Sequence, residues 1–485
     1  MKHWLFIAAC AWLVPAHAQD QAQSTEDETA FIQALYSQAL GQQLGYQLLQ
    51  NLSDEVGPRL AGSPGDALAV AWAVETLDSL GFDTVFVQPV DVRHWVRGVE
   101  KAKLRYRGRK GRVNKDLRVT ALGGSVGTQG RGLTAEVIEV VGREDFEAKK
   151  HLMKGKIVFF NEPMNPALIN TGSAYGRAGW QRWGGAILAG EQGAAGVLVR
   201  SLTHRLDDHP HTGSMSYKEG VEKIPAAGIS TRDAEWLHKQ LHVTPEAKIT
   251  LTLGCRDIGR ATSYNVIADW RGSTYPNEIA LVGGHLDSWD LGRGTQDDGA
   301  GVAHSIHALW LLKNAGYQPQ RTHRIVLFAN EEFGLDGARE YVRAGLDSGQ
   351  VHAIAIESDG GSGAPRGFSV HNIPGALEAI APFEKQLGRY GLREWAIGGS
   401  GADIGQIQDD GVLLIGYRPD SQHYFDYHHT AQDDMNSVHP RDLELGSASI
   451  AALLYLIDKY HISLASGLED ATSAAPNSSG GIRVK

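Results

Sequence analysis

From residue 264 onward, the chain alternates between short apolar runs and segments with helical periodicity. The apolar runs are NEIALVGG, HRIVLFAN, HAIAIESD and GVLLIGYRP, and the segment 299–316 places Val302, Ile306 and Leu309 at helical spacing. Near-continuous apolar strands separated by helices are typical of a largely parallel sheet that helices cover on both faces. The sequence therefore predicts an α/β fold with a mixed, largely parallel central sheet flanked by helices.

The length and composition fit a chain that folds around a large core. Of its 485 residues, 42% are hydrophobic, which is the proportion of a soluble globular protein with two or three domains. Acidic residues outnumber basic residues by 56 to 46, and the chain contains no long basic block, so we expect no nucleic-acid partner. Cys10 and Cys255 are the two cysteines. Loss of the first residues would leave no pair for an internal disulfide.

Residues 1–18 have the features of a secretory signal peptide. A basic residue precedes a short apolar stretch, and the small residues of AHA at 16–18 match a cleavage site. We therefore expect a mature chain that begins at Gln19 and is secreted or periplasmic. No later run approaches the roughly 18 apolar residues of a transmembrane segment. IAAC, which ends at Cys10, also resembles a lipoprotein cleavage box.

The remaining chain divides into a main domain and an insertion. Residues 128–245 contain four short strand patterns and one helix, which predicts a separate β-rich or α/β unit. The main domain then consists of residues 19–127 and 246–465. Its first residues, 19–30, are polar and expected to be loose, and residues 466–485 have the composition of a flexible tail.

The insertion shows no catalytic cluster. Its histidines His204, His209 and His211 fall within THRLDDHPHTG, whose Gly, Pro and Asp residues predict a solvated surface loop. A metal site in this loop is the alternative.

Histidines and carboxylates follow the ends of four predicted strands: His285 and Asp287, Glu331 and Glu332, Asp359, and His428 and His429. Ligands of such sheets bind beyond the carboxyl ends of the strands. Several carboxylates at one edge would repel one another unless a cation neutralised them. Mixed histidine and carboxylate ligands suit Zn²⁺, and Mn²⁺ or Co²⁺ are chemically permitted. The number of ligands fits two ions that share a bridging carboxylate.

The motifs HLD at 285, DDGAG at 297, NEEFG at 330, ESD at 357 and HHTAQDD at 428 resemble those of the M28 family of dizinc exopeptidases. GPRLAGSPG near the start and GADIGQ at 401 extend the resemblance over nearly all of residues 30–460. Within that family, the chain is most similar to the carboxypeptidase Q-like (plasma glutamate carboxypeptidase-like) subgroup. The resemblance implies the zinc-exopeptidase fold, with residues 128–245 as a protease-associated domain.

The resemblance also implies a role for each residue of the site. The ligands of two Zn²⁺ ions would be His285, Asp297, Glu332, Asp359 and His429. Asp297 rather than Asp298 would bridge the ions. The peptide bond between Asp297 and Asp298 would be cis. His429 is preferred to His428 because the family histidine precedes Ser or Thr, as His429 precedes Thr430.

Two further residues of the site are expected to be catalytic. Glu331 precedes a ligand and would act as the general base that takes a proton from the attacking water. Asp287 would accept the second ring proton of His285 and so fix its tautomer.

Four residues are candidates for substrate binding. Asp403 would add to a carboxylate-rich wall that attracts a free α-amino group, and Arg293 would pair with the substrate carboxylate. Tyr424 and Tyr427 would help to hold the oxyanion, or else they pack in the core.

The sequence thus favours a secreted exopeptidase that cleaves dipeptides or short peptides with a free N-terminus. The alternatives are a carboxypeptidase, a glutaminyl-cyclase-like zinc acyltransferase with one metal, and an inactive scaffold of the same fold. A fourth alternative is a binding module in which residues 128–245 recruit a partner. The sequence leaves open whether the enzyme forms a homodimer.

Overall fold

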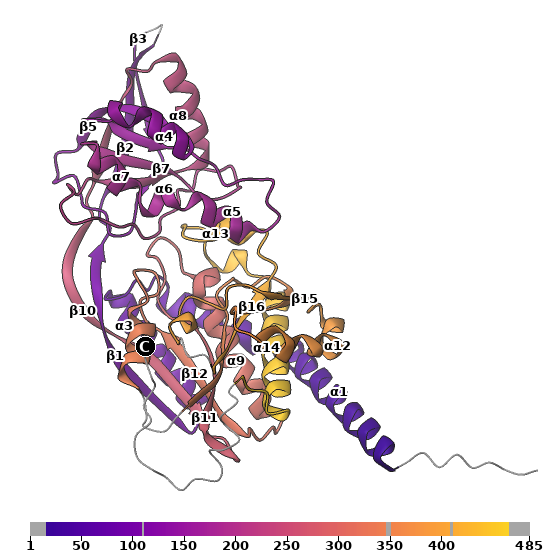
Figure 1. Ribbon diagram of the computed structural model, residues 1–485. Coiled ribbons are helices and arrows are strands. Elements are labelled where there is room, and N and C mark those ends of the chain that lie inside the picture. The colour runs from indigo at the N-terminus through magenta and orange to yellow at the C-terminus, as the bar shows by residue number, and fades with distance from the viewer. Residues whose placement is uncertain (1–15, 109–110, 346–350, 408–410, 465–485) are drawn as a thin grey trace, which may run out of the picture.

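The computed structural model describes residues 16–108, 111–345, 351–407 and 411–464. Most of the expected signal peptide and the whole expected tail, 466–485, lie outside the described residues. The described chain forms two eight-stranded sheets, each with its own helices, and they lie one above the other in Figure 1.

The main sheet occupies the lower part of Figure 1. Its strands are β1 (Thr84–Val96), β10 (Arg256–Trp270), β11 (Tyr275–His285), β12 (Arg321–Phe328), β13 (Val351–Glu357), β14 (Pro365–Val370), β15 (Glu394–Ile397) and β16 (Leu413–Pro419). Their order is β1-β10-β12-β11-β13-β16-β14-β15. The central strands β12, β11, β13 and β16 are parallel, whereas β1, β10 and β14 pair antiparallel with a neighbour. The predicted mixed, largely parallel sheet is confirmed.

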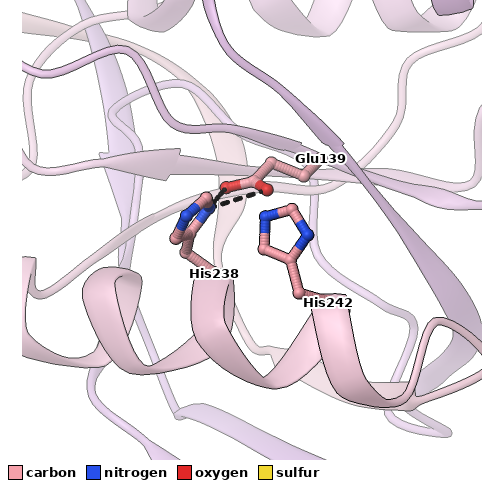
Figure 2. Close-up of side chains that lie close together, drawn as sticks. All are labelled: Glu139, His238 and His242. Carbon is pink, nitrogen blue, oxygen red and sulfur yellow. Dashed lines mark hydrogen bonds and ion pairs between the residues drawn. The ribbon is translucent and has the colours of Figure 1, made fainter.

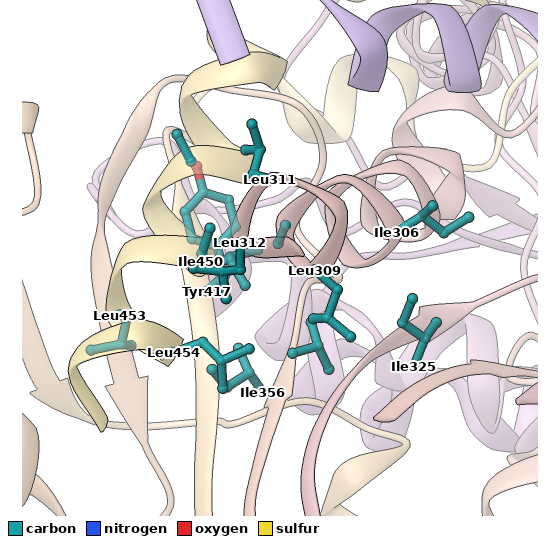
Figure 3. Packing of buried hydrophobic residues seen from close by; sticks show 14 of the residues in the cluster. Ile306, Leu309, Leu311, Leu312, Ile325, Ile356, Tyr417, Ile450, Leu453 and Leu454 are labelled. Carbon is teal, nitrogen blue, oxygen red and sulfur yellow. The ribbon is translucent and has the colours of Figure 1, made fainter. Parts of the chain in front are cut away.

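Helices cover both faces of this sheet. They are α1 (Ala16–Gln42), α2 (Leu44–Asn51), α3 (Pro64–Ser79), α9 (Ala300–Asn314), α10 (Asp336–Ala344), α11 (Ala376–Ile380), α12 (Glu384–Leu387) and α14 (Pro440–Lys459), whereas the short helix α13 (Tyr424–Tyr427) lies at the junction with the second sheet. Figure 3 shows α9 and α14 packed together, with Leu309 and Leu454 directed at the strands. Successive strand residues face opposite sides, so Val282 packs under α9 while Leu281 packs on the face of α10. This two-sided burial explains the apolar runs IALV, IVLF and AIAI within β11, β12 and β13.

The first helix differs from the prediction. Residues 19–30 were expected to be loose, but α1 is continuous from Ala16 to Gln42. No Gly or Pro interrupts residues 16–40, and Ala, Gln and Glu are good helix formers. Ile32 and Leu35 bury one face of the helix in the core, which anchors it.

The second sheet occupies the upper part of Figure 1. Its strands are β2 (Glu100–Gly108), β3 (Gly111–Leu117), β4 (Val119–Ala121), β5 (Leu133–Val140), β6 (Ile157–Phe160), β7 (Gly196–Arg200), β8 (Ala226–Ile229) and β9 (Lys248–Leu253), in the order β3-β2-β9-β5-β6-β7-β8-β4. Its helices are α4 (Gly142–Lys149), α5 (Thr171–Ala178), α6 (Trp180–Trp183), α7 (Gly185–Glu191) and α8 (Thr231–Val243). Strands β5 to β8 lie in the insertion predicted at 128–245, but β2, β3, β4 and β9 flank it and join the same sheet.

The two sheets are joined by strands and by loop contacts. Paired β1 and β10 run from the main sheet toward the second sheet, and α5 and α13 lie where the two parts meet (Figure 1). At this junction the Thr171 hydroxyl donates a hydrogen bond of 3.0 Å to the carbonyl oxygen of Ser421. Among the helices of the described ranges, none is both long and apolar enough to cross a membrane.

Candidate metal centre

The carboxyl ends of three parallel strands bring the predicted residues together. In the sheet register, His285 at the end of β11 is level with Phe328 of β12, and Gly283 is level with Glu357 of β13. Glu331 and Glu332 therefore begin the loop after β12 beside His285, and Asp359 follows β13 on its other side. The convergence predicted from the strand ends is confirmed.

Asp297 lies between two groups of side chains. Its Oδ1 atom lies 3.2 Å from Nε2 of His285, and its Oδ2 atom lies 3.1 Å from Nε2 of His429. One group of potential ligands contains His285, Asp297 and Asp359, and the other contains Asp297, His428 and His429. Within each group, the ligand atoms lie within 4.8 Å of one another. Asp297 is the residue that both groups share.

The donor set fits divalent metal ions. Oε2 of Glu332 lies 3.1 Å from Nε2 of His429, and Oε1 of Glu332 is buried without a hydrogen-bond donor. Leaving a buried acceptor unpaired costs roughly 1–3 kcal/mol, which a bound cation would offset. Imidazole and carboxylate together are the ligands that Zn²⁺ takes at catalytic sites.

His428 and His429 both reach this centre. Their rings stack with centroids 3.5 Å apart, and Nε2 of His428 lies 3.4 Å from Oδ2 of Asp297. The contact with Glu332 distinguishes His429, because the ion pairs of the described residues show Glu332 with His429 alone.

The peptide bond between Asp297 and Asp298 is cis, as the family resemblance implied. The Asp298 carboxylate accepts hydrogen bonds from the backbone N–H groups of His285, at 3.1 Å, and of Gly301, at 3.0 Å. Asp298 is fully buried in that position, so it fixes the start of α9 and leaves Asp297 to face the histidines.

Asp287 occupies a different position from the one expected. Its carboxylate accepts hydrogen bonds from the backbone N–H groups of Glu331, at 3.0 Å, and Glu332, at 3.3 Å. Nδ1 of His285 lies 3.0 Å from the backbone carbonyl oxygen of Asp287 and 3.7 Å from its carboxylate. The Asp287 carboxylate thus holds the next loop, and the Asp287 carbonyl oxygen is the nearer acceptor for the ring of His285.

Burial and neighbouring charges shift the acidity of the site. Burial raises the pKa of the Glu331 carboxyl well above its ordinary value, and the nearby Asp359 and Glu332 carboxylates add to this effect. Burial likewise raises the pKa of Glu332 to about 7. Burial also acts to raise the pKa of Asp297, but hydrogen bonds from His285 and His429 outweigh it and hold that pKa well below the usual range. Acidities shifted in this way are typical of functional sites.

Two of the four predicted substrate-binding residues, Arg293 and Tyr427, have their contacts away from the expected position. The Arg293 guanidinium donates to the carbonyl oxygen of Ser53, so it is held on the main domain's first helices. Asp403 lies near the centre, where it is fully buried without a hydrogen-bond donor to its carboxylate, and burial together with the Glu357 and Glu331 carboxylates raises its pKa. Tyr427 packs beneath the guanidinium of Arg205, 5.8 Å from its ring centroid.

Tyr424 does lie beside the centre. Its ring centroid is 5.1 Å from that of His428, and it lines a cavity of about 930 Å³ with Asp359 and Arg418. Burial raises the pKa of its hydroxyl well above the ordinary value, as do the Asp297 and Asp359 carboxylates. Arg418 and Asp359 also line an adjoining cavity of about 260 Å³. Sequence reasoning missed Arg418, which lies within an ordinary strand pattern.

The second unit contributes residues that sequence reasoning also missed. Nη1 of Arg182, on α6, lies 3.4 Å from Nδ1 of His429, and the Thr212 N–H donates a 3.0 Å hydrogen bond to the His429 carbonyl oxygen. His211 is 4% exposed, and burial lowers its pKa to about 3. The prediction of a solvated loop is wrong for His211, because this part of the loop packs against residues 428–430. His204 is exposed as expected.

Comparisons with known proteins agree with this geometry. Residues 265–454 match the model of peptidase family M28. Carboxypeptidase Q of Bos taurus is 33% identical over 442 residues, which cover 91% of this chain and 89% of the relative. The carboxypeptidase Q of Homo sapiens is 34% identical over 424 residues, or 87% of each chain.

Solved structures give the same result. A peptidase M28 precursor from Shewanella amazonensis has a TM-score of 0.84 at 37% identity and covers 89% of this chain and 97% of its own. A zinc aminopeptidase from Bacillus subtilis shares the fold, with a TM-score of 0.61 at 21% identity over 85% of this chain and 94% of its own. The family and fold expected from the motifs are confirmed. The chain belongs to peptidase family M28, with carboxypeptidase Q-like relatives, and is a metallo-exopeptidase.

Proposed function

We propose that this enzyme hydrolyses dipeptides and other short peptides at a centre of two Zn²⁺ ions bridged by Asp297. The observation that carries this proposal is the position of the Asp297 carboxylate, whose two oxygens face His285 and His429 separately. One ion would be held by His285, Asp297 and Asp359, and the other by Asp297, Glu332 and His429. Mn²⁺ or Co²⁺ would suit the same donors.

The ions would polarise the scissile carbonyl and bring the pKa of the attacking water from 15.7 towards about 7. Glu331 would take the proton of that water and pass it to the leaving amine. Asp287 would hold Glu331 in place through the backbone, and Tyr424 would donate a hydrogen bond to the oxyanion.

Recognition of the substrate would use both of its ends. Asp359 and Glu331 make the centre rich in carboxylates, and such a wall attracts the ammonium of a free N-terminus. Because Arg293 is held elsewhere, we propose that Arg418 pairs with the substrate carboxylate in its place. It lines both cavities beside Asp359 and has no ion-pair partner within the described ranges of the chain.

A panel of free, N-acetylated and C-amidated dipeptides, with products identified by mass spectrometry, tests this proposal. Acetylation should abolish cleavage, because it removes the ammonium, and amidation should weaken cleavage only in part. Equal cleavage of acetylated and free dipeptides would favour the alternative suggested by the name of the carboxypeptidase Q relatives, namely recognition of the C-terminus alone. Ammonia release from N-terminal glutamine without hydrolysis would indicate a cyclase, and inactivity of the metal-loaded protein would indicate a scaffold.

We also propose that the protein is exported and that residues 128–245 belong to a protease-associated domain. The signal-peptide pattern at 1–18 and the second sheet support these two statements. N-terminal sequencing of the protein from its native host should give Gln19 as the first residue. An N-terminus at Met1 would contradict export by this signal.

A further inference from the structure

A second cluster of metal-binding side chains lies in the upper unit, away from the candidate metal centre. Figure 2 shows Glu139 on β5 directed at His238 and His242 on α8. One ligand atom from each of the three residues lies within 4.8 Å of the others. Nδ1 of His238 lies 2.8 Å from Oε1 of Glu139 and 3.0 Å from Oε2.

The helix positions both histidines on one side. Residues four apart on an α-helix lie one above the other on the same face, so α8 presents His238 and His242 together. Their ring centroids are 4.6 Å apart. Glu139 and His238 are half-buried and His242 is exposed, so the cluster opens to solvent on the His242 side.

A chain of hydrogen bonds holds the carboxylate in place. Nδ2 of Asn161 donates to Oε1 of Glu139 at 2.6 Å, and the Arg200 guanidinium donates to Oδ1 of Asn161 at 3.2 Å. Outer hydrogen bonds of this kind orient ligand groups at metal sites. The Glu139 carboxylate is therefore positioned before any ion arrives.

We propose that Glu139, His238 and His242 bind one divalent transition-metal ion, such as Zn²⁺, with water as a further ligand. Two imidazoles and one carboxylate are a common set of Zn²⁺ ligands. Ligand atoms about 2.0–2.2 Å from a tetrahedral ion lie roughly 3.3 Å from one another, so a small rotation of the exposed His242 ring would close the site. The ion would tie α8 to β5 and is not part of the peptidase reaction.

The competing explanation is a simple ion pair between protonated His238 and Glu139. That pair does not involve His242, so replacement of His242 distinguishes the two explanations. An ion needs His242 as a ligand, whereas an ion pair leaves it a surface residue.

Crystals of the full-length protein, grown with Zn²⁺ and measured on both sides of the zinc absorption edge, test the proposal. An anomalous peak among the three side chains is expected in the wild type and in the control His151→Gln, which changes an exposed histidine of the same unit. The peak should be absent in His238→Gln and His242→Gln. The peaks around Asp297 should persist in all four proteins, so this result is independent of the proposed catalytic ions.

Calorimetric titration of the chelator-stripped protein with Zn²⁺ gives a second measurement. His242→Gln should weaken one class of site by at least about 100-fold, since removal of a ligand should exceed the 10–100-fold effect of outer partners. Unchanged binding in His242→Gln, or wild-type crystals with zinc at Asp297 and none at Glu139, would overturn the proposal.

Discussion

The Asp287 carboxylate accepts a hydrogen bond of 3.0 Å from the backbone N–H of Glu331. Asp287 follows β11 and Glu331 follows β12, so this bond fixes the distance between two adjacent strand-end loops. We therefore expect Asp287 to act on the reaction through the position of Glu331.

Substitution of Asp287 should lower turnover without removing metal. We expect Asp287→Ala to reduce kcat by about 10- to 100-fold, the usual effect of losing an outer partner at a metal site. Asp287→Asn keeps one acceptor and should recover part of the loss. Steady-state kinetics with elemental analysis provides the test, and an Asp287→Ala protein with full kcat would contradict this role.

The adjacent glutamates should give different phenotypes. Glu331→Gln should lower kcat by roughly 10² to 10⁴ at unchanged metal content, because it removes a positioned proton acceptor. Glu332→Gln should instead lower metal content, because Oε2 of Glu332 faces His429 across the centre. If Glu331→Gln lost metal and Glu332→Gln retained it, the two assignments would have to be exchanged.

Arg418 should govern recognition of the substrate carboxylate. Because a hydrogen bond to a charged group contributes about 1.5–3 kcal/mol, Arg418→Gln should raise KM for free dipeptides by about 10- to 100-fold. It should leave KM for C-amidated dipeptides nearly unchanged. Arg293→Gln is the matched control, since Arg293 is held by Ser53. A larger effect from Arg293→Gln than from Arg418→Gln would restore the original prediction.

Buried His352 should make the fold sensitive to acid. Burial lowers its pKa to about 3, with a further contribution from Arg324, and the Tyr341 hydroxyl lies 2.7 Å from Nε2 of the ring. Below pH 6.5 the unfolded chain binds a proton that the folded chain does not, so stability falls as the pH falls. Between pH 7 and pH 5 this amounts to about 2 kcal/mol. Because other buried groups also titrate in this range, the test is the difference between proteins: urea unfolding at the two pH values should show a loss about 2 kcal/mol smaller in His352→Gln than in the wild type, whereas equal losses would contradict it.

Strands buried on both faces could be predicted from the sequence, and others could not. β11, β12 and β13 contain the uninterrupted apolar runs IALV, IVLF and AIAI, whereas β2 reads EKAKLRYRG, in which charged residues alternate with the buried Ala102 and Leu104. The predicted insertion therefore began too late to include it. The apolar spacing of GALEAIAPFEKQLGRYG fits a single helix, but in the structure α11 ends at Ile380 and α12 begins at Glu384, with Pro382 between them.

Some residues of the site could likewise be predicted from the sequence, and others could not. His285, Glu332 and Asp359 could be predicted because strand ends converge by topology alone. Arg182 and His211 could not, because they reach His429 only through packing of the second unit on the main domain. Local sequence composition does not predict such a contact between two units.

The metal content of Asp297→Ala tests the central claim most directly. The measurement is best made in a His238→Gln background, so that zinc on α8 does not add to the count. Elemental analysis of purified protein should give about two Zn²⁺ per chain with Asp297 present and less than half an ion per chain with alanine in its place, because a bridging carboxylate holds both ions. Retention of one full ion per chain in Asp297→Ala would contradict the bridged pair.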